Sequence, residues 1–88
     1  MRDSRKSSSL TGERVRKLRK QRKLTQTQLS AYSQVPQPTI SQLESGQLQD
    51  ITGEVLARLA KALDTTPDYL VGLTDDPWRP AKRELSDR

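Results

Sequence analysis

A helix-start signal in the middle of this chain limits what it can fold into. Thr25 and Gln28 have the spacing of a capping box, in which the hydroxyl and the amide each bond a backbone N–H that the first helical turn leaves unpaired. This predicts a short helix over about 26–33. A second start follows at Pro36 and Pro38, because proline in a first turn costs no intrahelical hydrogen bond. Two short helices around a tight turn form a helix-turn-helix unit.

The rest of the chain predicts three more helices and no strand. Apolar residues recur at helical spacing over about 10–22 and again over about 53–63, where Thr52 is the capping residue. Thr66 and Pro67 start a very short fifth helix, and Gly46 and Gly72 stand where the third and fifth helices should end. The residues expected to face the core are Val15, Leu18, Leu29, Val35, Ile40, Leu43, Val55, Leu56, Leu59, Ala60, Leu63, Tyr69 and Leu70. The predicted fold class is all-α, a compact five-helix domain with flexible tails.

Apolar side chains are unevenly distributed along the 88 residues. They make up 31% of the chain, a low share, but the segments at both ends hold few of them. We therefore predict a flexible basic N-terminal tail at 1–9, a folded domain at 10–73 and a polar C-terminal tail or linker at 74–88. The folded segment has an ordinary apolar density, as a domain of this size needs.

Several function classes are excluded by the residues that the chain lacks. It contains no Cys and no His, so the usual zinc sites, thiol nucleophiles and imidazole bases are absent, and no metal or cofactor is expected. Carboxylates are scattered, and the pair Asp75 and Asp76 falls in the predicted linker. An enzyme is not expected. The apolar runs are too short for a membrane span, so a cytoplasmic protein with no membrane contact is the default prediction.

Positive charge is concentrated in the first part of the chain. Residues 1–34 carry ten basic and two acidic residues, a balance of +8, whereas residues 35–88 carry six basic and nine acidic residues, a balance of −3. Such asymmetry is typical of a protein with one end facing a polyanion. Taken by itself, it fits a solvated basic helix without a partner equally well.

Four stretches of the chain resemble the lambda-repressor-like (Cro-type) helix-turn-helix family. They are Leu24-Thr25-Gln26-Thr27-Gln28-Leu29, the run from Val35 to Gly46, Leu56-Ala57-Arg58-Leu59-Ala60-Lys61-Ala62-Leu63, and Pro67-Asp68-Tyr69-Leu70-Val71-Gly72. The resemblance covers roughly residues 11–73, with several motifs in the same order and spacing. It implies that the third helix enters the major groove of double-stranded DNA.

The resemblance also implies roles for individual residues. Those at positions that contact bases are Gln37, Pro38, Ser41 and Gln42; a glutamine amide donates and accepts together, which matches adenine. Those expected to contact phosphates are Gln26, Thr39, Ser45, Arg19 and Lys23. Arg19 and Glu44 match a partly buried structural ion pair between the first and third helices. Tyr69 is assigned to the core or to dimer packing.

The chain departs from the family pattern at its turns and at one loop. Relatives usually have glycine just before Leu24 and Val35, where this chain has Lys23 and Gln34; left-handed backbone there would cost each residue about 1 kcal/mol. Pro38 offers no backbone donor, although its ring suits a thymine methyl group. The loop 47–50 lacks the Lys or Arg that relatives often carry and ends in an acid. We therefore expect fewer phosphate contacts from it, with the missing anchorage supplied by the Lys/Arg-rich first helix or by Arg2, Arg5 and Lys6.

The leading prediction is a homodimeric transcriptional regulator, a repressor, that reads a near-palindromic operator. One alternative is an antitoxin that controls its own operon and binds a toxin through the C-terminal tail, where Trp78-Arg79-Pro80 is a candidate partner-binding element. Another is the N-terminal domain of a longer repressor. A protein-interaction module that keeps the fold without binding DNA belongs to a different class. The operator, the regulated genes and any inducer cannot be read from the sequence.

Overall fold

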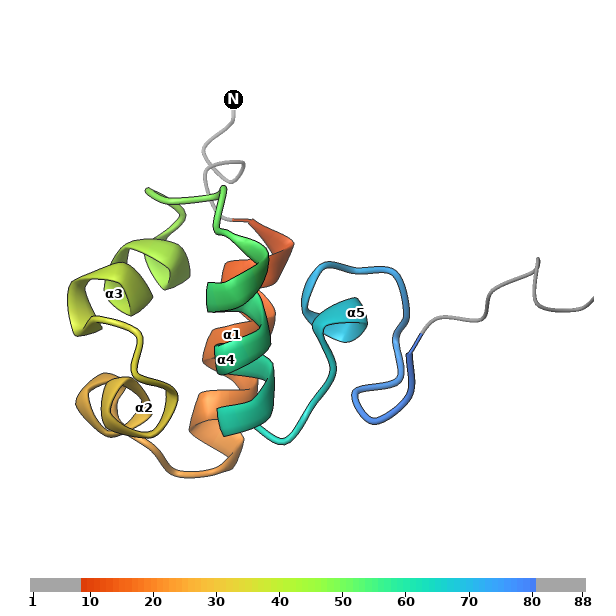
Figure 1. Ribbon diagram of the computed structural model, residues 1–88, viewed down its shortest axis with the longest axis horizontal. Coiled ribbons are helices and arrows are strands. Elements are labelled where there is room, and N and C mark those ends of the chain that lie inside the picture. Colours follow the sequence, from red (N-terminus) through yellow and green to blue (C-terminus); the bar gives the residue numbers. More distant parts are fainter. Residues whose placement is uncertain (1–8, 81–88) are drawn as a thin grey trace, which may run out of the picture.

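The computed structural model describes residues 9–80, and five helices account for most of them. They are α1 (Leu10–Gln21), α2 (Gln26–Ser33), α3 (Gln37–Ser45), α4 (Gly53–Ala62) and α5 (Pro67–Leu70). In Figure 1, α1 and α4 occupy the centre, α2 and α3 lie to one side, and α5 lies to the other. Both α1 and α4 contact α5, while α3 packs on α1 and α2 packs on α4. The all-α five-helix prediction is confirmed.

Side-chain caps fix where four of the helices begin. Thr25, Thr52 and Thr66 each accept a hydrogen bond from a backbone N–H in the first turn that follows, as the sequence predicts. The capping box of α2 is complete, because the Gln28 side chain also accepts from the Thr25 N–H. Ser9 caps α1 in the same way, which the sequence analysis did not anticipate. Each such cap contributes about 1 kcal/mol.

The core lies between the helices and has almost the predicted membership. Its buried hydrophobic side chains are Val15, Leu18, Leu29, Val35, Ile40, Leu43, Leu59, Ala60, Leu63, Tyr69 and Leu70. Val55 and Leu56 pack against this cluster but are only partly buried. Arg22, which shares the apolar face of the first helix, lies beside the end of α4, where its Nε donates to the Leu63 carbonyl over 2.6 Å. A cation there satisfies a carbonyl without an intrahelical partner.

The chain folds back on itself after α5. Arg14 of α1 donates to the carbonyl of Tyr69 at 2.6 Å and to that of Thr74 at 2.7 Å, and it pairs with Asp75 at 2.9 Å. Its guanidinium also lies 4.2 Å from the centre of the Tyr69 ring, a cation–π distance. Further along, the Thr66 N–H donates to the Pro77 carbonyl. Contacts with the helices therefore continue past residue 73.

The predicted boundary at 73 stays a prediction, since a linker could still begin beyond these contacts. The flexible tails predicted at 1–9 and 74–88 lie largely outside the described residues.

The first prediction concerns the closest approach between two helices. A Cβ placed on Gly12 of α1 would lie 2.0 Å from the Leu43 carbonyl oxygen of α3, so α1 would have to move. We expect Gly12→Ala to lower the free energy of unfolding by about 1–3 kcal/mol or more, the usual cost of overpacking. Urea denaturation measures this. Gly53→Ala is the control, because nothing lies within 4 Å of a Cβ there. Equal stability of the two variants would contradict the close packing.

The second prediction concerns the turns on either side of α2. Lys23 has φ 60° and Gln34 has φ 62°, so both are left-handed, as the resemblance to the family pattern implies. Lys23→Gly and Gln34→Gly should each raise the free energy of unfolding by up to about 1 kcal/mol, because glycine has no Cβ to strain there. The control is Lys17→Gly inside α1, which should lower it by roughly 0.5–1 kcal/mol. A loss of stability at Lys23 or Gln34 would argue against a strained turn.

Candidate nucleic-acid interface

Helix α3 presents one face to the core and the opposite face to solvent. Ile40 and Leu43 are fully buried on the inner side. Pro38, Gln42 and Ser45 are exposed on the outer side. Their positions follow the i, i+4, i+7 spacing that aligns side chains along one face of a helix. The outer face of α3 is therefore accessible to a ligand along its whole length.

The remaining residues predicted to contact bases or phosphates lie on α1, α2 and α3 and in the turn before α2. Gln37, Thr39 and Ser41 of α3 are half-buried, as is Gln26 at the start of α2. Lys23 is exposed in the turn before α2. The Ser45 hydroxyl donates to the Gln42 carbonyl and accepts from the N–H of Gln47. Of the residues predicted to contact DNA, the structure brings Arg19, Gln26, Ser41 and Ser45 together around one cleft, and the individual DNA contacts of all of them stay predictions.

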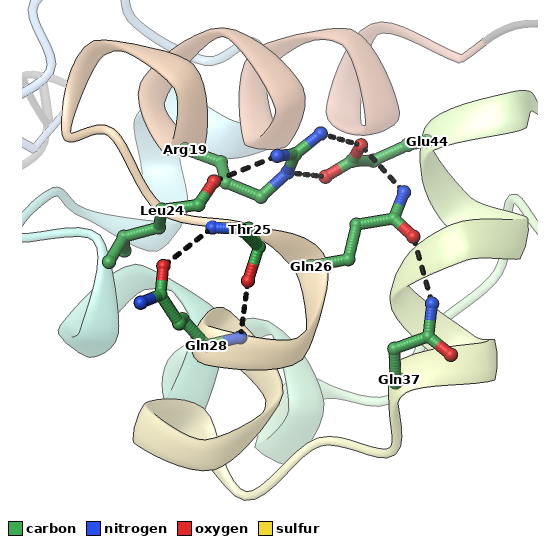
Figure 2. A network of polar contacts seen from close by, with 7 residues as sticks. All are labelled: Arg19, Leu24, Thr25, Gln26, Gln28, Gln37 and Glu44. Atoms are coloured by element: carbon green, nitrogen blue, oxygen red, sulfur yellow. Dashed lines mark hydrogen bonds and ion pairs between the residues drawn. The ribbon is translucent and has the colours of Figure 1, made fainter.

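Behind this surface, a buried ion pair joins α1 to α3. Arg19 donates from Nε and Nη2 to the two carboxylate oxygens of Glu44, each over 2.8 Å, and from Nη1 to the Leu24 carbonyl (Figure 2). The side chains are 11% and 4% exposed, so water screens the pair weakly. The hydrogen bond with Glu44 raises the pKa of Arg19 above its ordinary value, although burial acts in the opposite direction.

The raised pKa of Arg19 determines how the ion pair responds to pH. A raised pKa in the folded state means that the stabilisation is complete below the ordinary pKa of arginine. It is lost only as the pH rises through the still higher folded value. The guanidinium side of the pair therefore adds no pH dependence near neutrality.

The same carboxylate orients a chain of two glutamines. Gln26 donates from Nε2 to Glu44 at 3.1 Å, and its Oε1 accepts from Nε2 of Gln37 at 2.9 Å (Figure 2). A carboxylate only accepts hydrogen bonds, so it turns the amide nitrogen of Gln26 inward and its oxygen toward Gln37. Gln37 keeps its own Oε1 and a second N–H for a ligand. Its amide orientation is thus set from the α1–α3 ion pair.

The sequence analysis missed the bond between Gln26 and Gln37. It assigned one residue to phosphates and the other to bases, and treated them separately. The available signal was that both stand at helix N-termini within one helix-turn-helix unit, which brings those two ends together. The structure also forms a cleft beside α3, lined partly by Arg16 and Lys20 of α1, which the sequence analysis did not single out.

Within residues 9–80, no group of His, Cys, Asp or Glu is arranged to hold a metal ion. In the same range, no helix is long and apolar enough to cross a membrane.

Comparison with known proteins agrees with this geometry. Residues 15–70 match a family model described as Helix-turn-helix, and the chain belongs to this helix-turn-helix family. It is similar to the repressor protein C2 of Salmonella phage P22, with 40% identity over 65 residues. That match covers 74% of this chain and 30% of the phage protein, so the chain corresponds to under a third of its relative's length.

Two solved structures share the fold. The P22 c2 repressor in complex with a synthetic operator has a TM-score of 0.66 and 41% identity, over 73% of this chain and 96% of that one. The restriction-modification controller protein C.AhdI of Aeromonas hydrophila has a TM-score of 0.64 and 31% identity, over 69% of this chain and 91% of that one. The lambda-repressor-like resemblance inferred from the sequence is confirmed.

The third prediction tests the buried ion pair against an exposed one. Glu44→Ala should lower the free energy of unfolding by about 3–5 kcal/mol, because Arg19 would remain buried without its counter-charge. The matched control is Glu54→Ala, which removes the partner of Arg58 in a pair whose side chains are 69% and 44% exposed. That change should cost at most about 0.5 kcal/mol. Thermal and urea denaturation distinguish the two. Comparable losses of unfolding free energy would show that the buried pair stabilises the fold no more than the exposed pair does.

Proposed function

We propose that this chain binds double-stranded DNA sequence-specifically and acts as a transcriptional repressor, with α3 in the major groove. The observation that carries the proposal is the outer face of α3, which is exposed while its inner face is locked to the core. An α-helix fits the major groove, where base edges present distinct patterns of donors and acceptors. The similar P22 c2 repressor forms a complex with a synthetic operator, which supports operator binding by this chain.

The side chains of α3 suit different features of a base pair. Gln42 is exposed, and its amide can both donate and accept, as adenine requires. Gln37 offers an oxygen and one N–H in an orientation fixed by Gln26. The Pro38 ring is exposed and offers an apolar surface for a thymine methyl group. Ser41 can donate or accept at the edge of the contact. In this proposal, the glutamines recognise bases through hydrogen bonds, and Pro38 adds an apolar contact.

The phosphate contacts proposed for Gln26, Thr39, Ser45, Arg19 and Lys23 would position α3. Arg19 uses all three of its nitrogens inside the protein, so any contact it makes with a phosphate would come from its remaining N–H groups. The loop 47–50 contains no cation, and it adds little to holding the backbone.

We further propose that two copies bind as a homodimer. Each domain is small, and an isologous dimer would present two recognition helices about 34 Å apart to the halves of a near-palindromic operator. Exposed apolar side chains gather where α1 begins and after α5, since Leu10, Val71 and Leu73 are 46%, 44% and 65% exposed. Leu10 lies directly against Gly72, which joins these two segments in space. This surface supports a contact between copies.

Two alternative functions involve a protein partner. Trp78 is 65% exposed at the end of the described chain, which is compatible with a protein partner such as a toxin. An interaction module without DNA binding would use the same fold and show no salt-dependent binding of duplexes. Membership in a family of regulators supports neither a catalytic role nor a cofactor, and a cytoplasmic location stays a prediction.

The fourth prediction tests whether α3 recognises the DNA sequence. Selection from a random duplex pool should give a two-fold symmetric site for the wild-type chain. Gln42→Ala should weaken binding to that site by about 1–3 kcal/mol, while binding to unrelated duplexes changes little. Gln42 is the sharper probe, because its side chain makes no hydrogen bond to another described residue. Gln37→Ala would also remove one of the two hydrogen-bond partners of Gln26.

Gln21→Ala provides the matched control, since it shortens an exposed glutamine outside α3. Fluorescence anisotropy at fixed salt compares all the variants on the selected site and on an unrelated duplex. If Gln37→Ala and Gln42→Ala together leave the preference for the selected site unchanged, α3 is not the element that reads sequence.

A further inference from the structure

A cleft of about 270 Å³ opens between α1 and α3, next to the outer face of α3. Arg16 and Lys20 line it from α1, and Ser41 lines it from α3. Gln26, at the start of α2, closes a further side. Three helices therefore contribute to one polar depression that adjoins the surface proposed to enter the major groove.

The net charge of the cleft comes from two side chains. Arg19 and Glu44 also line it, but their bidentate pairing neutralises both charges. Arg16 and Lys20 are exposed, and among residues 9–80 neither has an acidic partner. They are four residues apart on α1 and thus neighbours on one helix face, where like charges repel each other. Neither side chain makes a hydrogen bond or an ion pair with another residue in the described part of the chain.

The other arginines of α1, and Arg22 directly after its end, are used inside the domain. Arg14 holds the segment after α5, and Arg22 bonds the carbonyl at the end of α4. Arg19 is committed to Glu44. The basic helix thus contains cations that stabilise the fold, the exposed Lys17 outside the cleft, and a pair, Arg16 and Lys20, that lines the cleft beside α3.

A phosphodiester group has the properties that this cleft complements. It carries one negative charge and exposed oxygens, for which Arg16 and Lys20 provide cationic donors and Ser41 a hydroxyl. At the start of α2, the Gln28 N–H is capped by Thr25, whereas the N–H groups of Gln26 and Thr27 have no intrahelical partner, which also favours an anion. The loop 47–50, which follows α3, has no cation and contains Asp50. Backbone attraction should therefore be one-sided.

We propose that Arg16 and Lys20, with Ser41, form a phosphodiester-binding site on the α1 side of α3. The site holds the DNA strand beside the major groove and supplies much of the salt dependence of binding. This inference rests on the proposed function and adds to it the position of the main backbone contact.

The test measures how binding of a random-sequence duplex falls with salt. The logarithm of the binding constant decreases with the logarithm of salt concentration by about 0.9 for each phosphate neutralised. Arg16→Gln and Lys20→Gln should each reduce that slope by about one, and the double variant by about two. Arg16→Lys keeps the charge and should keep the slope. None of these changes should lower the midpoint of urea unfolding, because both side chains are exposed and repel each other.

Lys61→Gln is the matched control, since it removes one exposed cation on α4 outside the cleft. It should leave the slope close to that of the wild type. The inference is overturned if the double variant keeps the wild-type slope, or if Lys61→Gln reduces the slope as much as Lys20→Gln does. The proposed function fails separately, and the inference with it, if the wild-type chain shows no salt-dependent duplex binding at all.

Discussion

The bidentate ion pair between Arg19 and Glu44 fixes the positions of the three helices that form the candidate interface. Arg19 belongs to α1 and Glu44 to α3, and the same guanidinium bonds the Leu24 carbonyl just before α2 begins. Glu44 in turn orients Gln26, and Gln26 orients Gln37. An amide on the outer surface therefore has its direction set by a charge pair in the interior. Within a weakly screened environment each of these bonds is strong, and each would be costly to leave unmade.

The turns around α2 show how the domain tolerates local strain to bury its core. Lys23 and Gln34 adopt left-handed backbone although they carry side chains, and each is followed at once by an apolar residue that packs inward. Val35 is 1% exposed, and Leu24 packs against the core cluster. Burying a side chain of that size contributes about 1.5–3 kcal/mol, which exceeds the strain of about 1 kcal/mol per left-handed residue. The turn geometry typical of the family is kept without its usual glycines.

The cations of α1 illustrate why net charge describes a binding surface poorly. Arg14 and Arg19 of α1 and Arg22 directly after it alternate along the chain with Arg16 and Lys20, and composition does not distinguish them. The former three bond carbonyls and carboxylates of distant segments, which ties α1 to α3, to the end of α4 and to the chain after α5. The latter two remain at the surface beside α3. A helix of this kind stabilises the fold with one face and offers another to an anion.

The sequence by itself determined the number, order and starts of the helices, because a cap, a proline at a first turn or a glycine at an end acts on neighbours within about four residues. It also determined most of the core, since burial follows helical periodicity. The pairing of Arg19 with Glu44 came from family resemblance, and the local pattern gave no sign of it. Only the tertiary structure decided the partners of Arg14 and Arg22 and the bond between Gln26 and Gln37. The residues that Arg14, Arg19 and Arg22 contact lie up to 61, 25 and 42 positions away. Such contacts depend on how the helices pack, which no local pattern encodes.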